Sequence, residues 1–453
     1  MKGGKERMES RILSLSGLNA SRLNNERDAW IYLPPSYDDL QSLRYPVLYM
    51  HVGQHVFQSR KRSGETWGLR ETLDGLIRNG EIQEIIVVAV EHKQNEGASE
   101  YFHDQCAYPI QMLGEQYEFF LIYELKPIID RMFRTLSDAS HTALMGSSAA
   151  GLATYNIGMR NPDVFGLLGI LSPFFVHLDE ETFVEQKQYR PHKPNPGQKL
   201  WLDIGGAEGF FMPIHVRSVA EELLSSGCVQ GETLYFYEEP DAAHAETDWG
   251  RRAQLPLRFF FGREGVSQRV DLFGPDTVGM EGASATLNAV VTLDNGLMYT
   301  DLEGGYTVDH PAILEVTPEG RLHPRKPGET IVRYQNRNSQ ASVKIAVVEK
   351  LSATVTVEVE VSVPDTTPED ASIHAVFKLS KVRKGLYRGT ARLPRGVCFQ
   401  FKVSRGYEKE EADDQNRPVP YRRLDADRDQ KVSYIVDNWI DLPAGEHTKG
   451  ELS

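Results

Sequence analysis

The sequence is poor in cysteine, in positive charge and in long apolar runs, and each shortage excludes a class of protein. Its three cysteines, Cys106, Cys228 and Cys398, are odd in number and lack metal-ligand spacing, so neither a disulfide framework nor a cysteine metal site is expected. The formal charge of −14 argues against nucleic-acid and anionic-membrane partners, because both need a basic face. No stretch reaches the roughly 18 apolar residues of a membrane-spanning helix.

Signals for export, phosphate binding and metal binding are lacking as well. The N-terminal residues contain no apolar signal segment, so we expect a cytoplasmic protein. No Gly-rich loop followed by Lys and Ser or Thr occurs, which leaves phosphate-dependent chemistry without support. The acidic run at 408–414 lacks the glycine and the ligand spacing of an EF-hand loop. We therefore expect no cofactor and no metal.

The pattern along the chain changes near residue 265. Before that point, short apolar runs alternate with amphipathic stretches, which is typical of a mainly parallel sheet with helices on both faces. After it, short alternating strands and turn signals replace the helical patterns. The predicted helices lie at 66–78, 117–133, 149–160, 213–226 and 248–261. We predict an α/β domain at 1–265, two all-β sandwich domains at 266–349 and 350–445, and a flexible tail at 446–453.

One serine lies among small residues where a predicted strand turns into a predicted helix. Residues 146–151 read Gly-Ser-Ser-Ala-Ala-Gly. A serine exposed at such a turn needs very small residues two places before and after it, because backbone and helix crowd the turn. Ser148 meets this condition with Gly146 and Ala150, whereas Ser147 would place Met145 in the crowded position. Ser148 is therefore the candidate nucleophile, and the alternative is a small-residue loop without chemistry.

Two later loops carry candidates for the base and the acid that a serine nucleophile needs. Glu208 follows the predicted strand 200–204 on a glycine-rich loop, and His244 follows the predicted strand 233–237. Loops after later strands are where a hydrolase sheet places these two groups. Asp203 is the competing acid, but it lies within its strand and ranks below Glu208.

A tetrahedral intermediate also needs two backbone N–H donors aimed at its oxyanion. Ala149, the residue after the candidate nucleophile, supplies one. The loop at 51–54, after an early strand, is expected to supply the other. We favour the amide of Gln54, with Gly53 letting the chain turn close to the serine. The alternative for this loop is a plain strand end.

Three segments together resemble the esterase D and enterochelin-esterase-like group of α/β-hydrolases, which includes feruloyl and acetyl-xylan esterases. They are the early loop at 49–57, the turn at 146–151 and the segment at 241–249, within a resemblance that covers about 22–262. The resemblance implies an α/β-hydrolase fold. It also implies ester hydrolysis through an acyl-enzyme, with Ser148 as nucleophile, Glu208 as acid and His244 as base.

The chain departs from the pattern of that group in its early loop and in its turn. Val52 and His55 stand where the group has Asp and Asn, and Ala150 replaces a glycine. Val52 and His55 are therefore candidate pocket residues, and an altered pocket or a reduced activity is expected. Two alternatives to an esterase follow. One is a catalytically weakened binding or scaffold protein, and the other is an acyltransferase to a sugar or lipid alcohol.

The two β segments have resemblances of their own. Residues 313–330 resemble bacterial Ig-like repeats, and residues 379–396 with 437–439 resemble a starch-binding-type carbohydrate module. The stretch 371–379 lacks the Trp-containing loop by which such modules stack on sugar, which argues against glycan binding. The expected partners are a small-molecule or glycan ester substrate, with acylated sugars and siderophore-like esters as candidates, and a second copy of the chain through the β segments.

A few conspicuous residues outside these motifs are expected to be structural. Three tryptophans are expected in the core: Trp67, Trp201 and Trp249. Three polar residues are expected on a solvated loop, with the mouth of the active site as the alternative: Glu96, Glu100 and His103.

Overall fold

The structure is a computed structural model that describes residues 9–442 apart from 59–63, 94–96, 105, 108, 180–183, 210, 283–284, 337 and 407. The predicted tail at 446–453 and Glu96 therefore lie outside the described residues. No helix within the described ranges has the length and apolarity needed to cross a bilayer.

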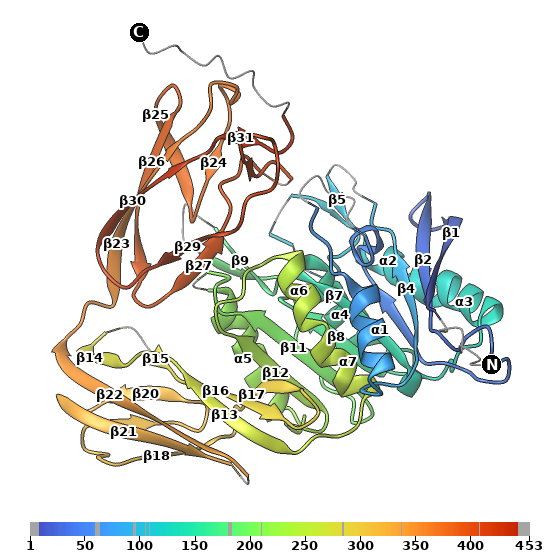
Figure 1. The fold of residues 1–453 in the computed structure, drawn as a ribbon, viewed down its shortest axis with the longest axis horizontal. Helices are drawn as coiled ribbons and strands as arrows, with labels where there is room; N and C mark the ends of the chain where they lie inside the picture. The colour runs from blue at the N-terminus through green and yellow to red at the C-terminus, as the bar shows by residue number, and fades with distance from the viewer. Residues whose placement is uncertain are drawn as a thin grey trace, which may run out of the picture.

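The first half of the chain folds around an eight-stranded sheet of order β1-β2-β4-β3-β7-β8-β11-β12 (Figure 1). The β1–β2 and β2–β4 pairs are antiparallel, and every later pair is parallel. The parallel strands are continuous buried runs, because helices cover both faces of the sheet. The strands are β1 Arg11–Ala20, β2 Asn25–Leu33, β3 Val47–Met50, β4 Ile86–Val90, β7 Thr142–Ser147, β8 Leu167–Leu171, β11 Lys199–Gly205 and β12 Leu234–Glu239.

Two buried hydrophobic clusters, one on each face, attach the helices to this sheet. The first contains residues of α2 Gly114–Phe119, the π-helical turn η2 Phe120–Leu125, α3 Lys126–Met132, α4 Ser148–Arg160 and α5 Met212–Ser225. The second contains residues of α1 Leu69–Arg78, α6 Glu246–Arg252 and α7 Gln254–Phe261. The helices thus lie in the regions where the sequence predicts them. Shorter elements complete this half: η1 Gly53–His55, η3 Ala139–His141, β5 Ala98–Ser99, β6 Gln111–Met112, β9 Val176–Leu178 and β10 Glu185–Lys187.

The edge strand β1 was not expected from the sequence. Only Leu18 and Ala20 of its ten residues are buried. A register shift between Leu15 and Leu18 interrupts its alternation of apolar and polar residues, so the strand lacks a continuous period-two signal.

The described residues beyond Phe261 form strands and no helix. Three sheets follow the α/β part, with the orders β13-β16-β17, β14-β22-β21-β18 and β15-β20-β19. Their strands are β13 Ser267–Phe273, β14 Thr277–Glu281, β15 Ala285–Thr286, β16 Asn288–Leu293, β17 Met298–Thr300, β18 Gly305–Val308, β19 Leu314–Val316, β20 Arg321–Pro324, β21 Gly328–Gln335 and β22 Gln340–Lys350.

The last β segment, with strands from Thr354 to Trp439, holds a five-stranded sheet of order β24-β25-β26-β23-β30 and the pairs β27-β29 and β28-β31. It has a hydrophobic cluster of its own, which includes Val357, Val359 and Trp439. Its strands are β23 Thr354–Ser362, β24 Ile373–His374, β25 Lys378–Arg383, β26 Leu386–Pro394, β27 Cys398–Phe401, β28 Glu411–Ala412, β29 Arg422–Asp425, β30 Gln430–Ile435 and β31 Asn438–Trp439.

The hydrophobic cluster under α1 and α7 continues across the predicted boundary at 265/266. It joins Trp201 and Tyr235 of the main sheet to Val291 and Leu293 of β16. The rings of Tyr235 and Tyr299 are tilted against each other with centroids 4.9 Å apart. The middle β segment, which contains the strands from Ser267 to Lys350, is therefore packed onto the α/β part through a shared core. This core couples the stability of the two parts.

We predict that Leu293→Ala destabilises the α/β part as well as the middle β segment. Leu293 is buried in the shared cluster, and such a truncation typically costs about 2–5 kcal/mol of unfolding free energy. Thermal unfolding followed by tryptophan fluorescence and by circular dichroism should shift together. Leu40→Ala, at a leucine that is half exposed, serves as the control and should change stability by less than about 0.5 kcal/mol. An unchanged fluorescence midpoint in Leu293→Ala would show that the two parts unfold independently.

Candidate active site

Ser148 lies at a sharp turn between β7 and α4. The strand ends at Ser147 and the helix begins at Ser148, whose φ of 56° lies in the left-handed region. A residue with a side chain is strained there, as is typical of functional turns. A Cβ on Gly146 would lie 2.8 Å from the carbonyl oxygen of Ala150, so glycine is required at that position. Ala150 is buried in the same turn, and the turn forms with its methyl group in place.

The structure brings together the three side chains that the sequence singled out. Nε2 of His244 lies 2.9 Å from Oγ of Ser148, and Nδ1 of His244 lies 2.7 Å from Oε2 of Glu208. When Nδ1–H donates to the carboxylate, Nε2 keeps its lone pair and can accept the serine proton. The arrangement can thus remove a proton from Ser148 and stabilise the positive charge that results on His244.

The second carboxylate oxygen of Glu208 is fixed by groups that the sequence did not indicate. Oε1 accepts hydrogen bonds from the amide of Gly205 at 2.8 Å and from the hydroxyl of Ser172 at 2.6 Å. The Ser172 hydroxyl in turn accepts from Nε1 of Trp249 at 3.0 Å and from Nη2 of Arg252 at 2.7 Å. The Ser172 hydroxyl thus uses its one donor and both of its acceptor positions. Glu208 is therefore oriented before any ligand binds.

Asp203, the competing acid, has different partners. Its carboxylate accepts from Nε1 of Trp201 at 2.8 Å and forms an ion pair with Nε of Arg252 at 3.2 Å. Burial raises the pKa of Asp203 to about 6, although Arg252 and the Trp201 hydrogen bond favour its charged form. The same carboxylate accepts from the amide of Ser172 at 3.3 Å. His244 bonds instead to Glu208 and Ser148, so Asp203 contacts the site through Arg252 and Ser172.

Arg252 is a fully buried cation among three carboxylates. Besides Asp203, it lies 3.5 Å from Glu208 and 3.5 Å from Glu239. Burial by itself would lower the pKa of Arg252, but the attraction of the carboxylates raises it above its ordinary value. Nothing in the local sequence marks this arginine, because its partners come from separate strands and loops.

Trp249 was expected in the core, and it also contacts the site. Its ring meets the imidazole of His244 edge to face, with centroids 4.8 Å apart and planes at 85°. Trp67 packs beside it with a centroid distance of 6.2 Å. Because Trp249 holds the ring of His244 and donates to Ser172, it orients both the base and the support of the acid.

The loop after β3 is built to present backbone N–H groups. Val52 has a φ of 53° and precedes the 3-10 helix η1. The first hydrogen bond of this turn runs from the amide of His55 to the carbonyl of Val52, so the N–H groups of Gly53 and Gln54 have no acceptor within the turn. Ala149 is the second residue of α4, and its N–H is likewise without an acceptor in its own helix.

The side chain of Gln54 fastens this turn to the end of β4. Its amide group donates to the carbonyl of His92 at 3.2 Å and accepts from the amide of His92 at 3.0 Å. A Cβ on Gly53 would lie 2.4 Å from the carbonyl oxygen of Ala89, so the turn presses against β4. Gln54 lines a separate cavity of about 290 Å³ and is not among the residues that line the cavity of Ser148.

Ser148 opens into a cavity of about 460 Å³. Val52 and His55, the two candidate pocket residues, both line it. Aromatic side chains form much of the rest of the wall, and two of the lining residues come from the last β segment. The lining residues are His51, Val52, His55, Glu65, Trp67, His92, Ser99, Tyr101, Ser147, Ser148, Ala149, Ala150, His244, Glu246, Trp249, Glu410 and Tyr421.

A buried polar network supports the early loop from behind, and here the expectation of a solvated loop was wrong. Glu100 is 1% exposed and pairs with Arg27 at 3.0 Å and with His92 at 2.9 Å. His103 is also buried. Nδ1 of His51 lies 2.8 Å from the hydroxyl of Tyr117, and burial lowers the pKa of His51 to about 3. His51 is therefore neutral at physiological pH and acts as structural support.

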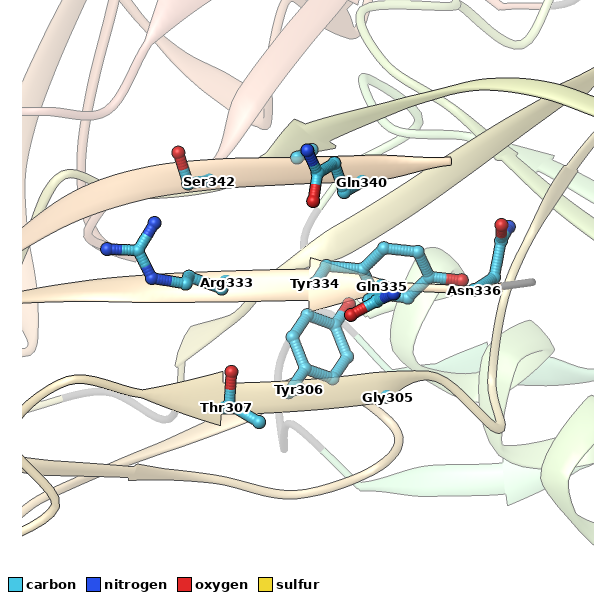
Figure 2. A pocket seen from close by; sticks show the side chains of 10 residues that line it. Gly305, Tyr306, Thr307, Arg333, Tyr334, Gln335, Asn336, Gln340 and Ser342 are labelled. Carbon is cyan, nitrogen blue, oxygen red and sulfur yellow. The ribbon is translucent and has the colours of Figure 1, made fainter. Parts of the chain in front are cut away.

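A second hollow, of about 610 Å³, lies on the face of β18, β21 and β22 (Figure 2). Its lining contains no histidine and no carboxylate. The rings of Tyr306 and Tyr334 lie against each other on adjacent strands (Figure 2), and the hydroxyl of the buried Tyr334 donates to Asp301. The hollow thus lacks the groups for acid-base chemistry, and Ser148 marks the candidate active site.

Comparison with known proteins bears on this site. The model of a family described as putative esterase matches residues 20–253. An endo-1,4-beta-xylanase/feruloyl esterase of Xylanibacter ruminicola is 34% identical over 149 residues, which are 31% of this chain. The chain covers only 19% of that relative's length. The protein YbbA of Bacillus subtilis is 21% identical over 189 residues, which are 40% of this chain and 68% of YbbA.

Solved structures also match part of the chain. A ferulic acid esterase, 19% identical, covers 56% of this chain and 98% of its own length, with a TM-score of 0.44. The enterobactin esterase FES from Shigella flexneri, 15% identical, covers 55% of this chain and 59% of its own length, with a TM-score of 0.42.

We predict that a fluorophosphonate labels Ser148 covalently, with loss of fluoride. Oγ of Ser148 faces Nε2 of His244 at 2.9 Å, so its proton can leave as it attacks phosphorus. Mass spectrometry of the digested protein should place the adduct on Ser148 and find none in Ser148→Ala. The matched control is Ser147→Ala, which should still be labelled at Ser148. Labelling of Ser147 would contradict the assignment.

Proposed function

Since the chain belongs to the putative esterase family, we propose that it is a serine carboxylic-ester hydrolase that works through an acyl-enzyme. The observation that carries this proposal is the hydrogen-bonded series from Ser148 through His244 to Glu208, at a strained strand-to-helix turn. A serine, a histidine and a carboxylate in this geometry suit nucleophilic attack on an acyl group.

Acylation begins when Nε2 of His244 accepts the proton of Ser148 as Oγ attacks the ester carbonyl. The carboxylate of Glu208, which lies 2.7 Å from Nδ1 of His244, stabilises the imidazolium. Its second oxygen remains bonded to Gly205 and Ser172, so the carboxylate does not have to reorient during the reaction. His244 then gives the proton to the leaving alcohol, and the acyl group remains on Ser148.

The N–H groups of Ala149 and Gln54 stabilise the negative charge that develops on the carbonyl oxygen. Each belongs to the first turn of a helix and has no acceptor there. Each such donor is worth about 2.7–4 kcal/mol of transition-state stabilisation. In deacylation, His244 removes a proton from water, which attacks the acyl-enzyme and releases the acid.

Acylated sugars with an aromatic acyl group are the proposed substrates. The cavity has a volume of about 460 Å³, and Trp67, Tyr101, Trp249 and Tyr421 are among its lining residues. Aromatic walls favour a flat, apolar acyl group. The similarity to a protein whose name includes feruloyl esterase supports the same choice.

We predict that Glu208→Gln lowers kcat for 4-nitrophenyl esters by about 10⁴-fold, because a neutral amide does not stabilise the imidazolium. Ser148→Ala should reduce turnover to the uncatalysed background. Asp203→Asn is the control, since Asp203 bonds to Arg252, Trp201 and the Ser172 amide while His244 bonds to Glu208, and it should lower kcat far less than Glu208→Gln. Equal losses in the Asp203 and Glu208 variants would reject Glu208 as the acid. A wild type no faster than Ser148→Ala would favour the scaffold alternative.

We further predict that Gly53→Ala lowers kcat by about 10²–10³-fold, the effect of losing one oxyanion donor. The added methyl group would meet the Ala89 carbonyl and displace the turn that carries the Gln54 amide. Gly75→Ala in α1, where a Cβ meets nothing within 4 Å, controls for the substitution. Thermal unfolding of both variants separates a catalytic effect from a loss of stability. A Gly53→Ala enzyme with wild-type kcat would exclude this turn from the oxyanion site.

A further inference from the structure

Two residues of the last β segment line the cavity of Ser148. Glu410 and Tyr421 belong to the part of the chain that the sequence assigned to a carbohydrate-module-like domain at 350–445, yet both face the same cavity as His244 and Trp67. Because a residue on a cavity wall can contact whatever fills it, this placement bears on what the site accepts.

The last β segment contacts the loops that carry Glu208 and His244. The amide of Gln400 in β27 donates to the carbonyl of Ala207 at 3.1 Å, beside Glu208. Arg423 in β29 forms an ion pair with Asp241 at 3.0 Å, and the side chain of Gln400 donates to the carbonyl of Asp241. Figure 1 shows β27 and β29 on the side of their segment that faces the α/β part. The pair β27-β29 therefore bridges the loop of Glu208 and the loop of His244.

A buried ion pair also joins the last β segment to the α/β part. Nζ of Lys402 lies 2.6 Å from Oε1 of Glu65, and the two side chains are 7% and 14% exposed. Nζ of Lys402 also lies 4.6 Å from the centre of the Tyr421 ring, a distance at which a cation attracts an aromatic face. Burying two charges costs free energy, and their mutual attraction offsets this cost only when their geometry is well defined. This pair and the contacts of β27 and β29 hold the last β segment against the α/β part in this structure.

The hydroxyl of Tyr421 takes part in the same cluster. Burial, followed by the nearby carboxylates Glu65, Glu246 and Glu410 and a hydrogen bond to Glu65, raises the pKa of Tyr421 above its ordinary value. Tyr421 thus remains a neutral donor, with its hydroxyl held at Glu65 and its ring available to the cavity.

We propose that the last β segment is a fixed wall of the active site and that Tyr421 is its specificity-determining residue. The ring of Tyr421 contacts the aromatic acyl group of the substrate, while Lys402 and Glu65 act as positioning residues that hold the ring in place. This inference rests on the proposed ester hydrolysis and adds a role for a segment that resembles a carbohydrate module but lacks its Trp-containing sugar-stacking loop. A small acyl group that ends near Ser148 does not reach the wall, whereas a bulky aromatic acyl group does.

The test compares kcat/KM for methyl ferulate with kcat/KM for 4-nitrophenyl acetate. Tyr421→Ala should lower the ratio of the two values by about tenfold, the size of one aromatic contact. Tyr421→Phe keeps the ring and should restore most of the ratio. Tyr434→Ala is the matched control, because Tyr434 lies in the same segment and packs against Phe401 without lining the cavity. It should leave the ratio unchanged.

A second variant tests the wall without touching Tyr421. Lys402→Met combined with Glu65→Gln removes both charges, so neither is left buried alone. The double variant should raise KM for methyl ferulate several-fold more than KM for 4-nitrophenyl acetate, and a single substitution of Lys402 by Arg should retain the wild-type ratio.

The possible results separate the two proposals. A wild-type ratio in both Tyr421→Ala and the double variant would overturn the proposal that the last β segment is a wall of the active site. An equal loss of kcat/KM for both substrates would overturn it as well. In either case Ser148 would still react with a fluorophosphonate and ester hydrolysis would stand. A wild type that hydrolyses neither ester and is not labelled at Ser148 would overturn the proposed function itself.

Discussion

The buried carboxylate of Glu208 is the point on which the geometry of the site depends. One of its oxygens bonds to His244, and the other bonds to the Gly205 amide and to Ser172. Ser172 is itself held by Trp249 and Arg252. A buried carboxylate without such partners would take up a proton and lose the charge that orients the histidine. The polar contacts around it are therefore a condition for any chemistry at Ser148.

These contacts in turn require that several distant segments meet. Arg252 at the end of α6 pairs with Asp203 on β11 and lies near Glu239 at the end of β12. From the other side, β27 of the last β segment bonds to the loop of Glu208. The loop that carries Glu208 thus contacts both the main sheet and the last β segment. Stability and catalytic geometry are consequently linked in this protein.

Local sequence signals were sufficient to single out Ser148, Glu208 and His244, which lie within hydrogen-bonding distance of one another in series. The turn at Gly146 needs small residues for steric reasons, and the two loops follow strands whose apolar character is continuous. Signals of the same kind located the helices of the α/β part. They failed for β1, whose alternation is interrupted by a register shift between Leu15 and Leu18, and for Glu100, whose partner Arg27 lies far away in the chain. From the sequence, a charged residue is predicted to be exposed to solvent unless its distant partner is known.

The sequence by itself determined the strand-to-helix turn, the alternation of strands and helices, and the chain order of serine, acid and histidine. It could do so because steric crowding and hydrophobic periodicity act over a few neighbouring residues. Only the tertiary structure decided that Arg252 and Ser172 hold Glu208, that Trp249 contacts His244, and that Tyr421 lines the cavity. Those relations depend on which loops and strands converge in space, and no local pattern along the chain encodes that convergence.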